Sequence, residues 1–181
     1  MKKCKNCRQD FKPRYSTLEK YCWDPDCKTI EAMQLVSKNK KKEEQDWAKK
    51  KAQIKQSLLT TSDYLKMAQQ VFNGYVRLRD AGSMCISCGR KPLKENAGHF
   101  FSQGGHGSVR FDERNCHLQC EHCNTYLSGN LIRYRENLIK KIGVPEFEAL
   151  SQLAYETKKW SKEEVQELIS KYKEKCKTLK K

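Results

Sequence analysis

Residues 85–124 read CISCGRKPLKENAGHFFSQGGHGSVRFDERNCHLQCEHCN, and this stretch decides the fold of the chain. A C-x2-C pair lies near each end of it, and His99 stands in the A-G-H-F string between them. A C-x2-C turn presents two thiolates to one metal ion, and a second pair completes a tetrahedral site. The stretch therefore predicts a structural Zn2+ ion, with four ligands: Cys85, Cys88, Cys120 and Cys123.

A second cysteine set lies near the N-terminus, with the spacing C-x2-C-x14-C-x4-C. Its members are Cys4, Cys7, Cys22 and Cys27. Disulfides are rare in reducing compartments, so metal binding accounts better for eight of the ten cysteines. We predict a second structural Zn2+ ion here, and we assign no role to Cys116 and Cys176.

Composition narrows the class of protein. The net charge of +15 favours a polyanionic partner, because each cation that neutralises a phosphate releases a counterion. A merely soluble basic protein is the alternative. A mean hydropathy of −0.92 argues for several small modules instead of one large core. The sequence has no long apolar run and no apolar signal region, so we expect a cytoplasmic protein without membrane contact.

Composition shifts along the chain predict four segments. We expect an N-terminal zinc finger at 1–29, a basic helical linker at 30–61, a zinc-containing core at 62–145 and a helical tail at 146–181. The linker is rich in lysine and lacks proline and glycine, so it could track DNA or serve as a solvated spacer.

Within the core, apolar residues at helical spacing predict a helix from Ser62, its N-cap, to Asp80. We expect short strands at 97–101 and 109–111, a helix beginning near Cys120 and another stretch opening at Asn130. In the tail, the S-K-E-E string at 161–164 is typical of a capping box.

The order of strand, loop, strand and helix after Cys85 resembles HNH nucleases, which have a ββα-metal core. Their motif places a histidine at the end of the first strand, an asparagine before the helix and a histidine or asparagine on the helix. His99, Asn115 and Asn124 match these positions. The expected fold class is therefore α+β and mainly helical, with a zinc-stapled HNH core, an N-terminal zinc finger and flanking helices.

A closer resemblance covers nearly the whole chain. The strings C-I-S-C-G, A-G-H-F, R-F-x-E-R-N, C-N-x-x-x-S-G-N-L and R-x-x-L-I-x-x-I-G are similar to the bacteriophage lambda NinG (Rap) recombination endonuclease family. The resemblance implies a phage or prophage protein that cuts branched double-stranded DNA, such as Holliday junctions and D-loops, alongside recombination proteins. Because resolving a junction takes two symmetric cuts, we expect a homodimer.

The chemistry gives each candidate a role. His99 is the expected general base, Asn124 a ligand of a catalytic Mg2+ or Mn2+ ion, and Asn115 a brace for the loop. His99 could instead be a structural histidine, and Asn124 could cap its helix. Asn130 is a rival metal ligand or an N-cap. His106, which also lies in this stretch, is expected at the surface, as are His117 and His122.

Two positions depart from the family patterns. Gly98 stands where many HNH proteins carry an acid, and Asn96 stands where the nearer family can have Asp. Losing a carboxylate weakens attraction for a hard dication, although Asp112 or Glu113 could compensate.

Two other functions stay open. In a non-catalytic DNA-binding accessory protein, both zinc sites would be scaffolds, and the His99 motif would be unnecessary. A site-specific homing or restriction nuclease would need an extended reader domain, which the sequence does not suggest. The apolar face at 64–76 and the tail after Trp160 are expected to form either a dimer surface or intramolecular core.

Overall fold

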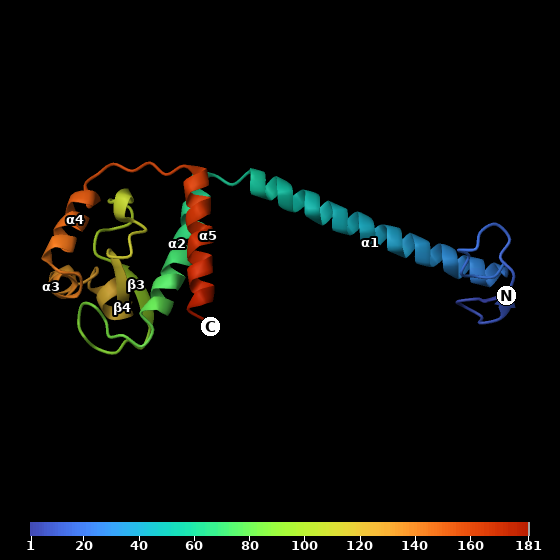
Figure 1. Cartoon of the computed structure of the whole chain (residues 1–181), viewed down its shortest axis with the longest axis horizontal. Helices are drawn as coiled ribbons and strands as arrows, with labels where there is room; N and C mark the ends of the chain where they lie inside the picture. The colour runs from blue at the N-terminus through green and yellow to red at the C-terminus, as the bar shows by residue number, and fades with distance from the viewer. Residues whose placement is uncertain (181) are drawn as a thin grey trace. The chain divides into compact units, whose positions relative to one another are not determined.

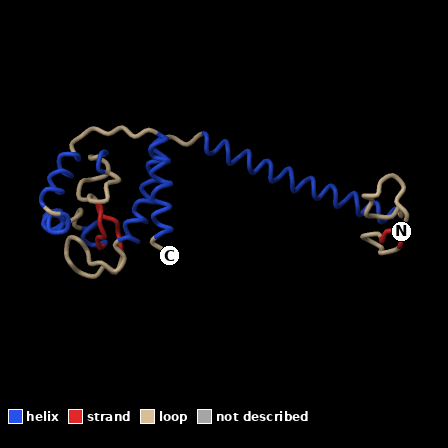
Figure 2. Tube along the Cα trace, viewed as in Figure 1, coloured by secondary structure: helices blue, strands red, loops and turns tan. Residues whose placement is uncertain are grey.

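The computed structural model describes residues 1–180 and divides into two compact units, which meet at the boundary between Leu58 and Leu59. The chain is mainly helical with two small antiparallel sheets (Figures 1 and 2), which confirms the predicted α+β class. None of the helices in residues 1–180 has the length and apolarity that a membrane crossing requires.

The first unit combines a two-stranded sheet with a long helix. Strands β1 (Lys2–Lys3) and β2 (Asp10–Phe11) pair antiparallel, and helix α1 spans Pro25–Ser57. The helix begins before the predicted start at residue 30, because Asp24 accepts hydrogen bonds from two free backbone N–H groups of the first turn. Within α1 only Cys27 is buried, so the lysine-rich part of the helix lies in solvent.

The second unit places two long helices side by side. Helices α2 (Thr61–Arg79) and α5 (Lys162–Thr178) pack against each other. A capping box starts each helix, as predicted for α5. In α2 the cap is Thr60, not Ser62, because the Thr60 and Asp63 side chains satisfy each other's backbone N–H groups.

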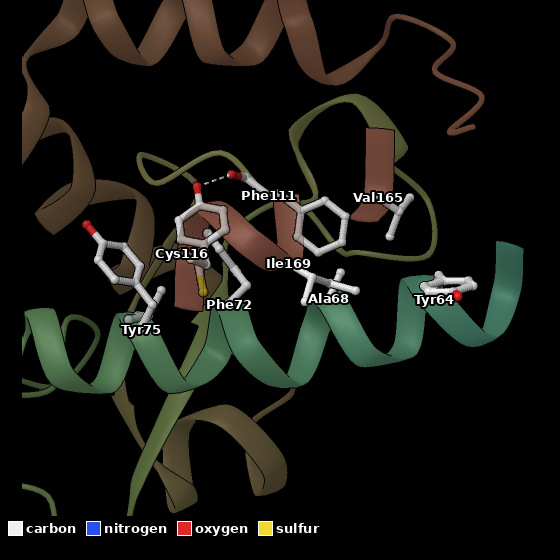
Figure 3. Close-up of a cluster of buried hydrophobic side chains, with 10 residues drawn as sticks. Tyr64, Ala68, Phe72, Tyr75, Phe111, Cys116, Val165 and Ile169 are labelled. Atoms are coloured by element: carbon white, nitrogen blue, oxygen red, sulfur yellow. Dashed lines mark hydrogen bonds between the residues drawn. The ribbon is translucent and has the colours of Figure 1, made fainter. Parts of the chain in front are cut away.

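The α2 and α5 faces build the first hydrophobic cluster of this unit (Figure 3). Phe72 lies at its centre, with its ring edge-on to Phe111 at 5.7 Å and to Tyr172 at 4.9 Å between centroids. From the sequence, the apolar face at 64–76 and the tail after Trp160 could form either a dimer surface or intramolecular core. They cover each other, so they are intramolecular core.

A two-stranded hairpin lies between α2–α5 and the other two helices of the second unit (Figure 1). It pairs β3 (Glu95–His99) with β4 (Cys116–Cys120), so that His99 stands opposite Cys116. The strand predicted at 109–111 is wrong: a 3-10 turn, η1 (Gly107–Val109), occupies that region. Strand β4 buries both of its faces, so its sequence C-H-L-Q-C lacks the usual apolar alternation.

Beyond β4 the chain is helical from near Cys120, as predicted. Cys120 ends the strand, and a short π-helical turn, η2 (His122–Tyr126), follows. Helices α3 (Leu131–Ile142) and α4 (Val144–Ala154) then pack with η1 around a second hydrophobic cluster. The Asn130 opening of α3 is as predicted.

Candidate functional site

The second cysteine set closes the open end of the hairpin. Cys85 and Cys88 lie on a turn before β3, Cys120 ends β4, and Cys123 lies in η2. Gly89 completes the turn with a φ of 67°, in the left-handed region, and donates its N–H to the Cys85 carbonyl. The sulfur atoms of the four cysteines lie within 4.8 Å of one another.

The electrostatics of this set suit a bound cation. Burial alone would raise the pKa of Cys85, but backbone hydrogen bonds from Cys120, Cys88 and Ser87 outweigh it and lower the pKa to about 7. Burial and the neighbouring thiols raise the pKa of Cys123 to about 12. Four thiolates this close repel one another without a cation between them, so the donor set fits a tetrahedral Zn2+ ion.

The N-terminal set has the same character. Its four sulfur atoms also lie within 4.8 Å of one another. Cys27 stands in the first turn of α1, where Asn6 Nδ2 donates to its sulfur at 3.4 Å. Backbone hydrogen bonds from Cys22, Cys7 and Asn6 outweigh the effect of burial and lower the pKa of Cys4 to about 6. Both predicted sets could therefore hold Zn2+.

His99 ends β3 with a half-buried imidazole that faces α2. Its Nε2 lies 3.1 Å from the Arg110 carbonyl oxygen, and its Nδ1 lies 3.5 Å from the Cys116 sulfur. A carbonyl oxygen can only accept a hydrogen bond, so the proton stays on Nε2 and the lone pair on Nδ1. Burial lowers the pKa of His99 to about 4, and the Arg110 carbonyl offsets only part of that shift. The ring is therefore neutral at pH 7.

Asn115 ties the two ends of the loop between β3 and β4 together. Its Oδ1 accepts from the Phe101 N–H at 2.8 Å, and its Nδ2 donates to the carbonyls of Phe101 and Val109, each at 3.0 Å. Asn115 is fully buried, and its own carbonyl accepts from the Phe100 N–H. The loop carries Arg110, so these contacts fix the carbonyl that orients His99.

The two other asparagines lie with the cysteines instead of the imidazole. Asn124 is half-buried in η2, directly after Cys123. Asn130 Nδ2 approaches the Cys123 sulfur at 3.5 Å, and its side chain does not cap α3. Within residues 1–180, the imidazole of His99 forms hydrogen-bonding contacts with Arg110 and Cys116, and the Gln69 amide nitrogen lies 3.5 Å from its Nε2.

The side chains around His99 do not form a carboxylate site for a hard dication such as Mg2+. Asp112 pairs with Arg114 at 2.7 Å, and Glu113 pairs with Lys175 and accepts from Tyr75, so neither replaces the missing acid. Within residues 1–180, the two cysteine sets are the only groups of three or more His, Cys, Asp or Glu side chains close enough to share a metal ion. The carboxylates that Mg2+ usually prefers are thus not assembled here.

The other histidines have structural contacts, with one exception. His117 is buried, contrary to the surface position that we expected, and its Nδ1 lies 3.1 Å from Arg79 and 3.2 Å from Lys141. His106 Nδ1 contacts the Ala154 carbonyl at 2.9 Å. His122 is exposed in η2, as expected.

Sequence reasoning missed Gln69 and Arg110. Gln69 is buried in α2, lies 3.5 Å from His99 Nε2 and accepts a hydrogen bond from Arg110 Nε at 2.9 Å. The signal was available: a polar residue beside Ala68, on the face that also carries Phe72, is unusual in a core helix. The role of the Arg110 carbonyl has no such signal, because it belongs to the backbone.

Gly98 lacks an acid for a steric reason. A Cβ atom there would meet the Gln119 side chain at 2.1 Å. Gln119 is fully buried and its amide donates to Ser87 Oγ and the Gly129 carbonyl, so it cannot move away cheaply. Position 98 therefore excludes any side chain while Gln119 keeps this conformation.

We expect Gly98→Ala to lower the free energy of unfolding by about 1–3 kcal/mol, through overpacking of the hairpin. Gly74→Ala is the matched control, because a Cβ there meets nothing within 4 Å. Since Gly74 lies inside α2, alanine should stabilise the protein by about 0.5–1 kcal/mol. Thermal or urea unfolding would measure the change in the free energy of unfolding for both variants. Equal changes in Gly98→Ala and Gly74→Ala would contradict the steric explanation.

Comparison with known proteins places the chain among phage proteins. The family model described as Bacteriophage Lambda NinG protein matches residues 1–181. Over 192 residues the chain is 34% identical to protein ninG of Salmonella phage P22 and 35% identical to that of Escherichia phage 933W. It is 34% identical to protein ninG of Escherichia phage lambda over 194 residues. Each match covers 98% of this chain and 93% of the relative. No solved structure matches.

Proposed function

The chain belongs to the NinG family, and from that premise we propose that it is a structure-selective DNA endonuclease that cuts branched recombination intermediates such as Holliday junctions and D-loops. The net charge of +15 supports a DNA substrate. The order β3, loop, β4, η2 supports the proposal, because it repeats the strand, loop, strand and helix order in which the sequence resembles HNH nucleases.

The observation that carries the proposal is the fixed tautomer of His99. With Nε2 donating to the Arg110 carbonyl, Nδ1 keeps a lone pair at neutral pH, and it would accept a proton from water in place of its contact with the buried Cys116 thiol at 3.5 Å. Asn115 would act as a positioning residue, because it fixes the loop that carries the Arg110 carbonyl.

A divalent cation, Mg2+ or Mn2+, belongs to the proposal as the group that neutralises charge on the phosphate. The residues around His99 do not supply a carboxylate set for it. We therefore assign no protein ligand to the ion, because Asn124 and Asn130, the two candidates from the sequence, lie with the cysteines, and the role of His99 as base is derived without it.

The same shortage of carboxylates favours a second candidate, a non-catalytic DNA-binding accessory protein of recombination. Both cysteine sets would then be scaffolds, and the contacts of His99 with Arg110 and Cys116 would serve packing. This candidate predicts junction binding without strand cleavage under any cation.

The two candidates separate in one experiment. The zinc-loaded chain is incubated with a labelled four-way junction and with a linear duplex, in the absence of divalent cation and with Mg2+ or Mn2+. We expect cation-dependent cutting of the junction and little cutting of the duplex. Light scattering of the complex should give two chains per junction, since resolution takes paired cuts. Junction binding without cutting would reject the nuclease and support the accessory protein.

A further inference from the structure

A groove of about 540 Å³ opens at the second cysteine set, and Cys88, Cys120 and Cys123 are among its lining residues. The turn after Cys88, the end of β4, η2 and the first turn of α3 line it. Gln69, Arg110 and Cys116, which contact His99, are not among its lining residues. The groove is therefore a feature separate from the imidazole site.

The groove carries free positive charge. Arg90, Lys91 and Arg133 line it, and all three are exposed. Lys94 also lines it but pairs with Glu121, so those two charges cancel. Within residues 1–180, Arg90, Lys91 and Arg133 form no ion pair, whereas Arg79, Arg114 and Lys175 elsewhere in the unit each do.

Flat and apolar surface lies among these cations. The Tyr126 side chain is 70% exposed and lines the groove next to His122, with 6.1 Å between ring centroids and 35° between ring planes. Leu93, which also lines the groove, is completely exposed. An exposed tyrosine ring among unpaired cations is the combination that binds unpaired nucleotides, since every base has a face that can stack.

We propose that this groove binds a single-stranded segment of DNA, with phosphates against Arg90, Lys91 and Arg133 and a base stacked on Tyr126. In a duplex the base faces are covered by their neighbours and cannot reach Tyr126, whereas a branch point or D-loop exposes them. The inference rests on the proposed function for its choice of DNA, and it adds the part of the substrate that this surface recognises.

The competing explanation is that the cations neutralise the metal site. Four thiolates around one Zn2+ ion carry a net charge of −2, and nearby arginine and lysine side chains would stabilise it. Under that explanation, removing Arg90 and Arg133 loosens zinc, and Tyr126 is irrelevant. Under ours, DNA affinity falls while the zinc content stays the same.

The test measures binding of a short oligothymidylate by fluorescence anisotropy, without added divalent cation, in a His99→Ala background. Cutting cannot interfere there, so the result does not depend on nuclease activity. The variants are Arg90→Ala with Arg133→Ala, and separately Tyr126→Ala and Tyr126→Phe. The matched control, Lys159→Ala with Lys173→Ala, removes two exposed charges of the same unit away from the groove.

We expect the arginine pair to lower affinity about tenfold or more and to reduce the salt dependence of binding by about 0.7 per charge removed. Tyr126→Ala should lower affinity at least about fivefold, and Tyr126→Phe should restore it, because stacking needs only the ring. Zinc content should stay at the wild-type value. The proposal is overturned if the control pair lowers affinity as much as the arginine pair, if Tyr126→Ala binds normally, or if zinc is lost together with affinity.

Discussion

Cys123→Ala is expected to remove one of two zinc ions and to unfold the unit that begins at Leu59. The reason is the position of the predicted ion: its four ligands would come from the turn before β3, the end of β4 and η2, so the ion would join both sides of the hairpin. Structural zinc contributes about 10–16 kcal/mol of apparent binding free energy, which is comparable to the whole stability of a domain. Zinc content by mass spectrometry and thermal unfolding by circular dichroism would measure the effect.

Cys116→Ala is the control for this prediction. Cys116 is as deeply buried as Cys123 but stands in the α2 cluster, outside both metal sets. Removing its sulfur should cost about 1–2 kcal/mol and leave two zinc ions bound. If Cys123→Ala kept both zinc ions and unfolded at the same temperature as Cys116→Ala, the cysteine set would not be a structural metal site.

The sequence predicted the metal sets because their signal is local. A C-x2-C turn needs no tertiary information, and all eight cysteines lie where the spacing places them. The same holds for the Ser161–Glu164 capping box and for the start of α3 at Asn130. Each of these depends on contacts within a few residues, which the sequence displays directly.

The errors in the hairpin concern residues whose environment is set by distant partners. The second strand was predicted at 109–111, but β4 lies at Cys116–Cys120 with His117 and Gln119 buried. His117 contacts Arg79 and Lys141, and the amide nitrogen of Gln119 donates to Ser87 and Gly129. Arg79, Lys141 and Ser87 are remote in sequence from these residues. A strand that buries polar residues through such contacts shows no alternation, so its pattern could not be recognised.

The candidate site also has a part that the sequence predicted and a part that it did not. His99 and Asn115 were identified from the motif, and their positions on either side of one loop follow from the hairpin. Two groups support His99: the Gln69 side chain and the Arg110 carbonyl. Their positions depend on the packing of α2 and on the conformation of the loop. The tautomer of His99 and its low pKa are therefore properties of the fold, and the motif alone does not contain them.

His99→Ala is expected to lower the rate of junction cutting by about 10²–10⁴, the range that a general base contributes, while junction affinity stays unchanged. The matched control is His106→Ala, which removes another half-buried histidine, in the loop after β3, that also contacts a backbone carbonyl. His106 does not contact His99, so its loss should leave the rate close to wild type. Single-turnover cutting with saturating protein would measure the chemical step for both variants.

The pH dependence of the cutting rate is a second test of this prediction, because a histidine with only a structural role would not affect it. The base is active in its neutral form, and burial keeps the pKa of His99 near 4, so its neutral form persists well below the ordinary value of 6.5. In the wild-type protein, protonation of the base should therefore not slow cutting between pH 7 and pH 5, and the loss should begin only as the pH approaches 4. A fall centred near pH 6.5 would mean that the working base is a solvated histidine. Retained cutting in His99→Ala would remove His99 from the chemistry altogether.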